Sequence, residues 1–175
     1  MKITVLNGSP RRNGNTEIMV NEFVRGAGEA GHETTVIYLA GKKINGCLGC
    51  QYCFVHDGVC VQKDDMADVL KVLDETDLVV FASPIYWFDI TGQLKCTIDR
   101  MYARGKVGFH FRKTALLLDS GADKVYDAAL SQYRAMCAYL RWESVGEICI
   151  PGMEEKGSMS TAPGLKEVYE LGRGL

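Results

Sequence analysis

The run from Leu78 to Ser83 constrains the fold of this chain more than any other segment. It reads Leu-Val-Val-Phe-Ala-Ser and contains no charged residue. A short apolar run of this kind is typical of a central strand in a parallel sheet, because helices cover both faces of such a strand. Parallel strands also need crossover connections, which are usually helices. The run therefore predicts a sheet with helices on both sides.

The rest of the chain repeats this alternation of strand and helix. Further strands are expected at 2–6, 34–39, 114–118 and 145–150, and helices at about 17–30, 64–75, 91–102, 124–141 and 165–171. Five strands alternating with helices predict an α/β fold with three layers and a doubly wound, five-stranded parallel sheet. Ligands of such sheets bind at the carboxyl ends of the strands. We therefore expect the loops 7–16, 84–92 and 119–123 to converge on one site.

Length and charge narrow the class of ligand. A chain of 175 residues is expected to form one domain, residues 1–175. Its 20 basic residues balance 22 acidic ones without a basic cluster, so nucleic acid is not an expected partner. The first apolar run is too short for a signal peptide, and no run approaches membrane-spanning length. We expect a soluble, cytoplasmic protein that binds a small molecule and no membrane.

The loop from Asn7 to Thr16 has the composition of an anion site. It is rich in Gly, Ser, Asn and Thr, it carries Arg11 and Arg12, and it leads from a strand into a helix. Backbone amides at a helix N-terminus, hydroxyl donors and arginine charges all favour phosphate. The loop lacks the lysine of GxxxxGKS/T, and its glycines do not form GxGxxG. We therefore expect neither phosphoryl transfer from ATP nor a Rossmann dinucleotide site.

Two further loops favour a flat ligand. Three consecutive aromatic residues, Tyr86, Trp87 and Phe88, follow the central strand, where they could stack on a planar ring. Some of these rings could equally belong to the core or to a dimer contact. Ser120 and Gly121 follow the fourth strand, and small residues there let backbone approach a ligand closely. A phosphate loop, an aromatic shelf and a Gly/Ser loop together describe a flavin mononucleotide site.

Several motifs resemble those of the NAD(P)H-dependent FMN reductases of the flavodoxin-like superfamily. They are Gly8-Ser9-Pro10-Arg11, Gly14-Asn15-Thr16, Ser83-Pro84-Ile85-Tyr86-Trp87, Leu94-Lys95 and Ile98-Asp99-Arg100, in that order along the chain. The resemblance extends to about residue 123 and implies a flavodoxin-like sheet with strand order 2-1-3-4-5. It also implies that Ser9, Arg11, Asn15 and Thr16 hold the FMN phosphate, that Pro84, Ile85, Tyr86, Trp87 and Phe88 line the isoalloxazine, and that Ser120 and Gly121 close its other side.

Four of the seven cysteines lie close together in an irregular segment at about 42–63. Cys47, Cys50, Cys53 and Cys60 resemble, with Asp64-Asp65-Met66, the cysteine loop of the iron-sulfur flavoproteins, which holds a [4Fe-4S] cluster. Cysteines at i, i+3 and i+6 can bind three corners of a cubane, and a fourth thiolate can complete it. Similar loops also occur in flavin reductases without a cluster, and zinc suits this spacing less well. If a cluster is bound, we expect Tyr52 and Phe54 to lean toward the flavin.

The resemblance implies an FMN-dependent oxidoreductase. Electrons would pass from NAD(P)H through the flavin to a quinone, nitroaromatic, free flavin or protein acceptor. One alternative is an electron carrier fed by a ferredoxin-like partner without nicotinamide. Another is a redox-sensing or metal-binding interaction module that needs no FMN. We also expect a homodimer or tetramer, because Tyr86, Trp87, Phe88, Met101 and Tyr102 are too many large apolar groups for one exposed ligand edge.

Overall fold

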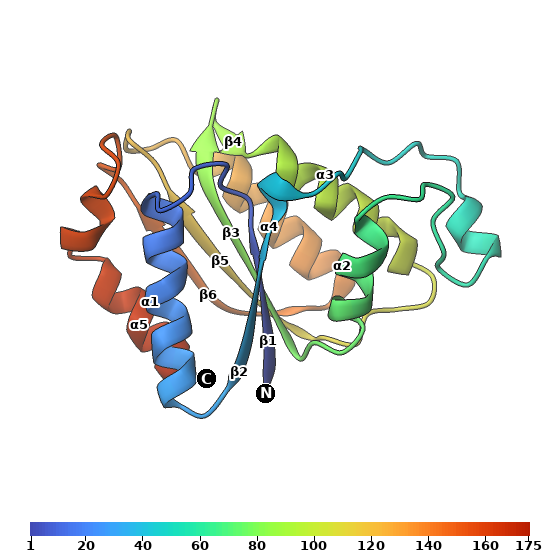
Figure 1. Cartoon of the computed structure of the whole chain (residues 1–175), viewed down its shortest axis with the longest axis horizontal. Coiled ribbons are helices and arrows are strands. Elements are labelled where there is room, and N and C mark those ends of the chain that lie inside the picture. Colours follow the sequence, from blue (N-terminus) through green and yellow to red (C-terminus); the bar gives the residue numbers. More distant parts are fainter.

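The computed structural model describes residues 1–175 (Figure 1). Its strands are β1 (Lys2–Asn7), β2 (Glu33–Tyr38), β3 (Leu78–Tyr86), β4 (Asp89–Ile90), β5 (Lys113–Asp119) and β6 (Glu143–Ile150). Its α-helices are α1 (Asn15–Glu29), α2 (Met66–Leu73), α3 (Gly92–Met101), α4 (Asp127–Leu140) and α5 (Leu165–Arg173). None of these helices is both long enough and apolar enough to cross a membrane.

The five long strands form a parallel sheet in the order β2-β1-β3-β5-β6. The predicted α/β class and the alternation of strands and helices are confirmed. The predicted count of five strands is not exact, because β4 pairs antiparallel with the end of β3. A strand of two residues is too short for any hydrophobic period, so the sequence could not reveal it.

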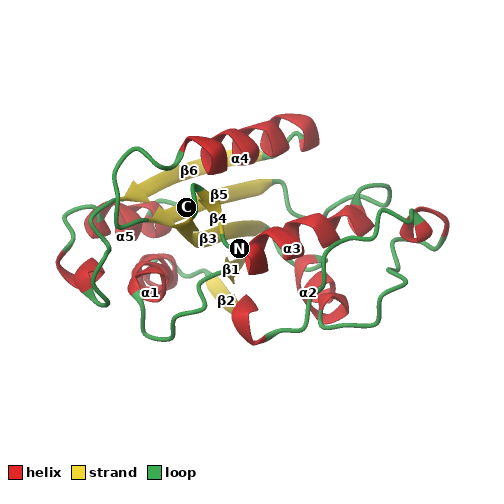
Figure 2. Ribbon diagram, turned by 90° about the horizontal axis from the view of Figure 1, so that it is seen from above, coloured by secondary structure: helices red, strands yellow, loops and turns green.

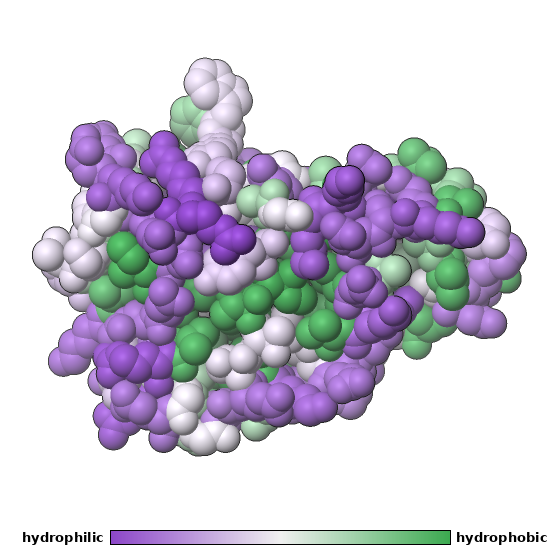
Figure 3. Space-filling view, viewed as in Figure 1, coloured by the Kyte–Doolittle hydropathy of each residue, from purple (hydrophilic) through white to green (hydrophobic).

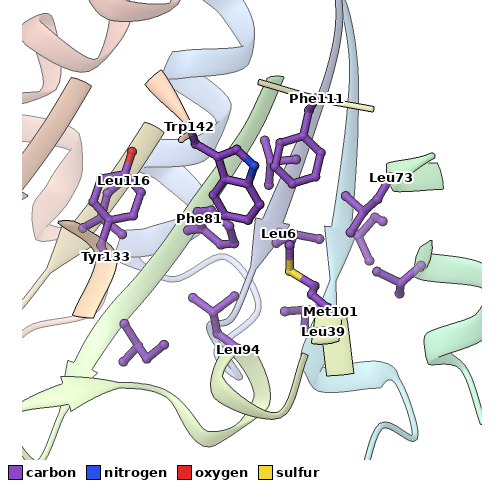
Figure 4. Packing of buried hydrophobic residues seen from close by; sticks show 14 of the residues in the cluster. Leu6, Leu39, Leu73, Phe81, Leu94, Met101, Phe111, Leu116, Tyr133 and Trp142 are labelled. Atoms are coloured by element: carbon purple, nitrogen blue, oxygen red, sulfur yellow. The ribbon is translucent and has the colours of Figure 1, made fainter. Parts of the chain in front are cut away.

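Helices cover both faces of the sheet. Figure 2 shows α1 and α5 on one side and α2, α3 and α4 on the other. In β3, Val79 and Phe81 pack toward α2, α3 and α4, whereas Leu78 and Val80 pack toward α1 and α5. The apolar run is therefore explained by burial on both faces. Aromatic rings fill much of the larger cluster (Figure 4). Phe81 packs edge-on against Tyr133 with ring centroids 6.2 Å apart, and Phe111 packs against Trp142 at 4.7 Å.

Candidate functional site

The loops that follow β1, β5 and β6 meet the end of β3 at the carboxyl edge of the sheet and enclose a pocket of about 160 Å³. Most of the residues predicted to bind the cofactor line it, namely Ser9, Arg11, Asn15, Thr16, Pro84, Ile85, Tyr86, Ser120 and Gly121. Trp87 and Phe88 do not. Sequence reasoning missed Gly14, Asp119, Met153, Glu154 and Lys156 as lining residues. The last three lie in the loop after β6, which could have been expected from its position at the same sheet edge.

The loop after β1 offers this pocket donors for an anion. Helix α1 begins at Asn15, and no side chain caps its N-terminus. The first amides of a helix have no partner within the helix, so they are free to bind an anion. Ser9 fixes the preceding turn: its backbone N–H donates to Asn7 Oδ1 at 2.9 Å, and its Oγ accepts from the Arg11 backbone N–H at 3.3 Å. Arg11 adds an exposed guanidinium at the same place.

The side chain of Asn15 holds the loop after β6 in position. Its Nδ2 donates to the carbonyl oxygens of Met153 and Glu155, at 3.0 and 2.8 Å, and its Oδ1 accepts from the Gly157 backbone N–H at 2.8 Å. These bonds use the amide group fully. Asn15 therefore shapes the pocket through this loop, while its backbone N–H lies in the first turn of α1, where amides have no partner within the helix.

A buried carboxyl group forms part of the pocket wall. Asp119 ends β5 with only 4% of its surface exposed, and Thr16 Oγ1 donates to its Oδ1 at 2.6 Å. Burial raises the pKa of Asp119 to about 6, although the bond from Thr16 and the charge of Arg11 act in the opposite direction. The pocket thus combines anion donors with one acidic group whose ionisation depends on pH near neutrality.

A second buried threonine, Thr91, joins the loop after β1 to the start of α3. Thr91 Oγ1 donates to the carbonyl oxygen of Gly8 at 2.8 Å, and the Thr91 backbone N–H donates to Ser83 Oγ at 3.0 Å. A Cβ on Gly8 would lie 2.7 Å from Thr91 Oγ1. The position therefore requires glycine, because the first loop and the start of α3 approach too closely for a side chain.

The hairpin between β3 and β4 projects from the carboxyl edge of the sheet (Figures 1 and 3). Its two tip residues, Trp87 and Phe88, both have positive φ, at 50° and 70°, and are 93% and 59% exposed. Tight hairpins need this backbone conformation, yet it is costly for large aromatic residues. The strain holds two aromatic rings in solvent beside the pocket rather than inside it.

The cysteine segment lies on the other side of α3, away from the pocket (Figure 1). Cys47 and Cys50 are exposed, Cys60 is partly buried and Cys53 is buried, and all four are free thiols. No three or more His, Cys, Asp or Glu side chains are placed to hold a metal ion. The segment is irregular apart from a short 3₁₀ turn at Tyr52–Val55, as predicted.

The orientation expected for Tyr52 and Phe54 is wrong. Tyr52 stacks on His56, with ring centroids 3.6 Å apart, and Phe54 stacks on Tyr102 at 4.7 Å. Neither ring reaches the pocket, and no residue of 42–63 lines it. The aromatic residues of this segment pack within the segment and onto Tyr102 at the end of α3.

Three basic side chains, one near the end of α3 and two just after it, donate hydrogen bonds to backbone carbonyl groups of the cysteine segment. Arg100 Nη1 donates to the Asn45 carbonyl oxygen at 3.0 Å, Arg104 Nη1 to that of Gly58 at 2.7 Å, and Lys106 Nζ to that of Phe54 at 2.9 Å. These three hydrogen bonds fix the backbone of the segment at Asn45, Phe54 and Gly58.

The chain matches the family described as NADPH-dependent FMN reductase over residues 1–152. It is 39% identical over 105 residues to an iron-sulfur flavoprotein of Archaeoglobus fulgidus, a match that covers 60% of this chain and 47% of the relative. It is 38% identical over 112 residues to an iron-sulfur flavoprotein of Methanocaldococcus jannaschii, covering 64% and 57% of the two chains. The matched part is therefore about half the length of these relatives.

Solved structures share the fold. An NAD(P)H:quinone oxidoreductase from Methanothermobacter marburgensis superposes with a TM-score of 0.81 at 19% identity, covering 99% of this chain and 95% of the other. An FMN-dependent NADH-azoreductase from Bacillus anthracis, solved in complex with FMN, gives a TM-score of 0.72 at 16% identity, with 98% and 97% covered. The family match spans most of the chain and contains the loops after β1, β3 and β5, although Met153, Glu154 and Lys156 of the loop after β6 lie beyond it. This chain therefore belongs to the NADPH-dependent FMN reductase family.

Proposed function

We propose that this protein is an FMN-dependent oxidoreductase that oxidises NAD(P)H and reduces a quinone, nitroaromatic, flavin or protein acceptor. The observation that carries the proposal is the uncapped N-terminus of α1 beside Ser9 and Arg11 in a pocket at the carboxyl edge of the sheet. Such a pocket is suited to a phosphate group. Membership of the FMN reductase family supports FMN as the ligand.

The chain's own residues would bind and orient the cofactor. The amides of Asn15 and Thr16, with Ser9 and Arg11, would hold the phosphate, and the backbone around Pro84 would border the flat ring. Bound FMN would supply the hydride-accepting chemistry. Ser120 and Gly121 would close the opposite side, where a Cβ on Gly121 would lie only 2.6 Å from a carbon of Glu154. No side chain need transfer a proton for this role.

Self-association would complete the site. The pocket is small for a whole FMN, since ligand pockets usually exceed about 300 Å³, so the ring would extend past Tyr86 toward the exposed hairpin tip. Trp87 and Phe88 expose apolar area there that a second copy could cover. Met101 cannot contribute as expected, because it is 3% exposed and belongs to the core. We propose a homodimer or tetramer in which the hairpin tip is buried.

For the cysteine segment we propose a [4Fe-4S] cluster held by Cys47, Cys50, Cys53 and Cys60. The chemistry of the donor set suits a cluster, because four free thiols lie in one short segment. Burial, followed by the neighbouring Cys60, Cys47 and Cys50, raises the pKa of the Cys53 thiol. The four thiols are not placed around one metal position in the structure, so the assignment rests on their donor chemistry and spacing. Arg100 lies beside Cys60 with a buried Nε that has no hydrogen-bond partner, and its charge would favour an anionic cluster. The relatives named iron-sulfur flavoproteins support the same assignment. The cluster would relay electrons.

An anaerobic preparation tests both assignments. We expect a flavin spectrum, steady oxidation of NADH or NADPH with a quinone acceptor, and about four irons and four sulfides per chain. Cys50→Ala should remove the iron and leave the FMN, whereas Cys96→Ala, outside the segment, should change neither. If bound FMN is reduced by ferredoxin but not by NADH or NADPH, the protein is instead an electron carrier. FMN without iron would leave the cysteines as free thiols, and a colourless protein that takes up no FMN would favour the interaction module.

A further inference from the structure

The buried carboxyl group of Asp119 has no role in the function proposed above. It lines the same pocket as Ser9 and Arg11. Its Oδ1 accepts a hydrogen bond from the Thr16 hydroxyl at 2.6 Å, so that hydroxyl is not free to donate to a ligand. A carboxylate is an acceptor and carries the same sign of charge as phosphate, so it opposes an anion placed in this pocket. The protein therefore contains a group that would disfavour its own phosphate ligand when ionised.

Few groups around Asp119 could offset the repulsion between its carboxylate and a bound phosphate. The charged and titratable groups near it are Arg11 after β1, Asp123 after β5, Tyr126 before α4, Cys149 on β6, and Glu154 and Lys156 after β6. Burial raises the pKa of Tyr126 and of Cys149, to about 11 for Cys149, so both are neutral at pH 7. Asp119 itself forms no ion pair, and its one hydrogen bond comes from Thr16.

We propose that Asp119 takes up a proton from solvent when the phosphate of FMN binds, and that this frees the Thr16 hydroxyl to donate to the phosphate. The proposal rests on the proposed FMN site. In the free protein the carboxylate accepts the Thr16 hydrogen bond. On binding, one proton from water converts the carboxylate to a carboxylic acid, which removes the repulsion and can itself donate a hydrogen bond. Asp119 thereby makes affinity for the phosphorylated flavin depend on pH.

The direction in which pH changes FMN affinity follows from the coupling between FMN binding and the protonation of Asp119. Because burial sets the pKa of Asp119 at about 6 in the free protein, the group is largely ionised at pH 8 and largely protonated at pH 5. A bound phosphate would raise this pKa further. FMN binding should therefore take up close to one proton at pH 7.5, where the FMN phosphate is already mostly dianionic. At pH 5 Asp119 should contribute little proton uptake, and its contribution to FMN affinity should become less favourable as the pH rises above about 6.

Titration of FMN into the flavin-free protein in a calorimeter, repeated in buffers of different ionisation enthalpy, measures the number of protons taken up per FMN bound. At pH 7.5 the phosphate of free FMN is already mostly dianionic, since its second pKa is about 6. We expect roughly one proton taken up per FMN, and about none for riboflavin, which lacks the phosphate. FMN binding without proton uptake would overturn this inference alone. Failure of both flavins to bind would overturn the proposed function as well.

The Asp119→Asn variant provides the second measurement. It keeps the size of the side chain and an oxygen that can accept from Thr16, but it cannot ionise. Relative to wild type, we expect FMN affinity at pH 8 to increase by about tenfold or more and affinity at pH 5 to be similar. Riboflavin affinity should be unchanged at both pH values. An equal effect on FMN at pH 5 and pH 8 would contradict the proposal, as would an equal effect on riboflavin.

Discussion

The guanidinium of Arg100 donates to both carboxylate oxygens of Asp64, at 2.6 and 2.9 Å, in an ion pair whose side chains are only 1% and 9% exposed. The pair joins the end of the cysteine segment to α3. The same guanidinium also donates to the Asn45 carbonyl oxygen at the start of the segment. One arginine therefore fixes both ends of a segment that has almost no regular structure.

Asp64→Ala should destabilise the protein by about 3–5 kcal/mol, because it leaves a buried guanidinium without its counter-ion. Urea unfolding followed by circular dichroism measures the free energy of unfolding. Asp68→Ala is the matched control, since Asp68 pairs with Lys71 in solvent, and we expect it to change stability little. Equal effects of the two substitutions would contradict the role given to the buried pair.

Gly8→Ala should destabilise the protein by roughly 1–3 kcal/mol through overpacking. The new Cβ would lie 2.7 Å from Thr91 Oγ1 and 2.8 Å from Leu94 Cβ. Gly28→Ala is the control, because Gly28 lies in α1 with open space around it, and alanine there should stabilise by up to about 1 kcal/mol. Thermal unfolding compares the two. A Gly8→Ala protein as stable as wild type would contradict this prediction, because it would show that the loop after β1 and the start of α3 can move apart.

The double substitution Trp87→Asn with Phe88→Gly should stabilise an isolated subunit and weaken self-association. Asn-Gly suits the positive φ values of the hairpin tip, and each strained residue costs on the order of 1 kcal/mol or more. Light scattering at micromolar concentration reports the mass. A wild-type mass equal to that of one 19.3 kDa chain would contradict the proposed assembly. The control is Trp87→Tyr, which keeps an aromatic ring and should still associate.

The stability of the flavin-free protein should depend on Asp119. Burial raises the pKa of Asp119 to about 6 in the folded state, above the 3.8 of a solvated aspartate, so the native state binds the proton more tightly than the unfolded state. The resulting stability is fully present below pH 4 and is lost as the pH rises through 6. Asp119→Asn should therefore gain up to about 3 kcal/mol relative to wild type at pH 7, with the gain shrinking toward pH 4. A gain that is independent of pH would contradict the assignment.

Much of the fold could be predicted because it follows from hydrophobic patterns. The apolar run at Leu78–Ser83 and the apolar stripe of α1 identify their elements locally, and the convergence of loops follows from the parallel sheet. The hairpin of Trp87 and Phe88 could not be predicted in the same way. Aromatic residues at positive φ contradict local preference, so their exposure is visible only in the structure.

The details of the site depend on contacts between distant residues. Asn15 is bonded to a loop about 140 residues away, and Thr16 to Asp119, 103 residues away. No local period encodes such pairs. The family resemblance implies that both residues hold the FMN phosphate, but it does not show these contacts of their side chains. The cysteine segment was predicted correctly as irregular. Its place outside the pocket depends on contacts with Arg100, Arg104 and Lys106, 46 to 55 residues away, which its own residues do not reveal.

The binding of FMN to Arg11→Ala and Arg12→Ala variants tests the central claim most directly. Arg11 lines the pocket, whereas the guanidinium of Arg12 lies over the Tyr38 ring, 4.7 Å from its centroid and outside the pocket. Loss of a charge-assisted hydrogen bond costs about 1.5–3 kcal/mol. Titration followed by flavin fluorescence should therefore give roughly ten- to more than a hundredfold weaker binding for Arg11→Ala, and nearly unchanged binding for Arg12→Ala. Unchanged affinity in Arg11→Ala, or equal losses in both variants, would contradict the account.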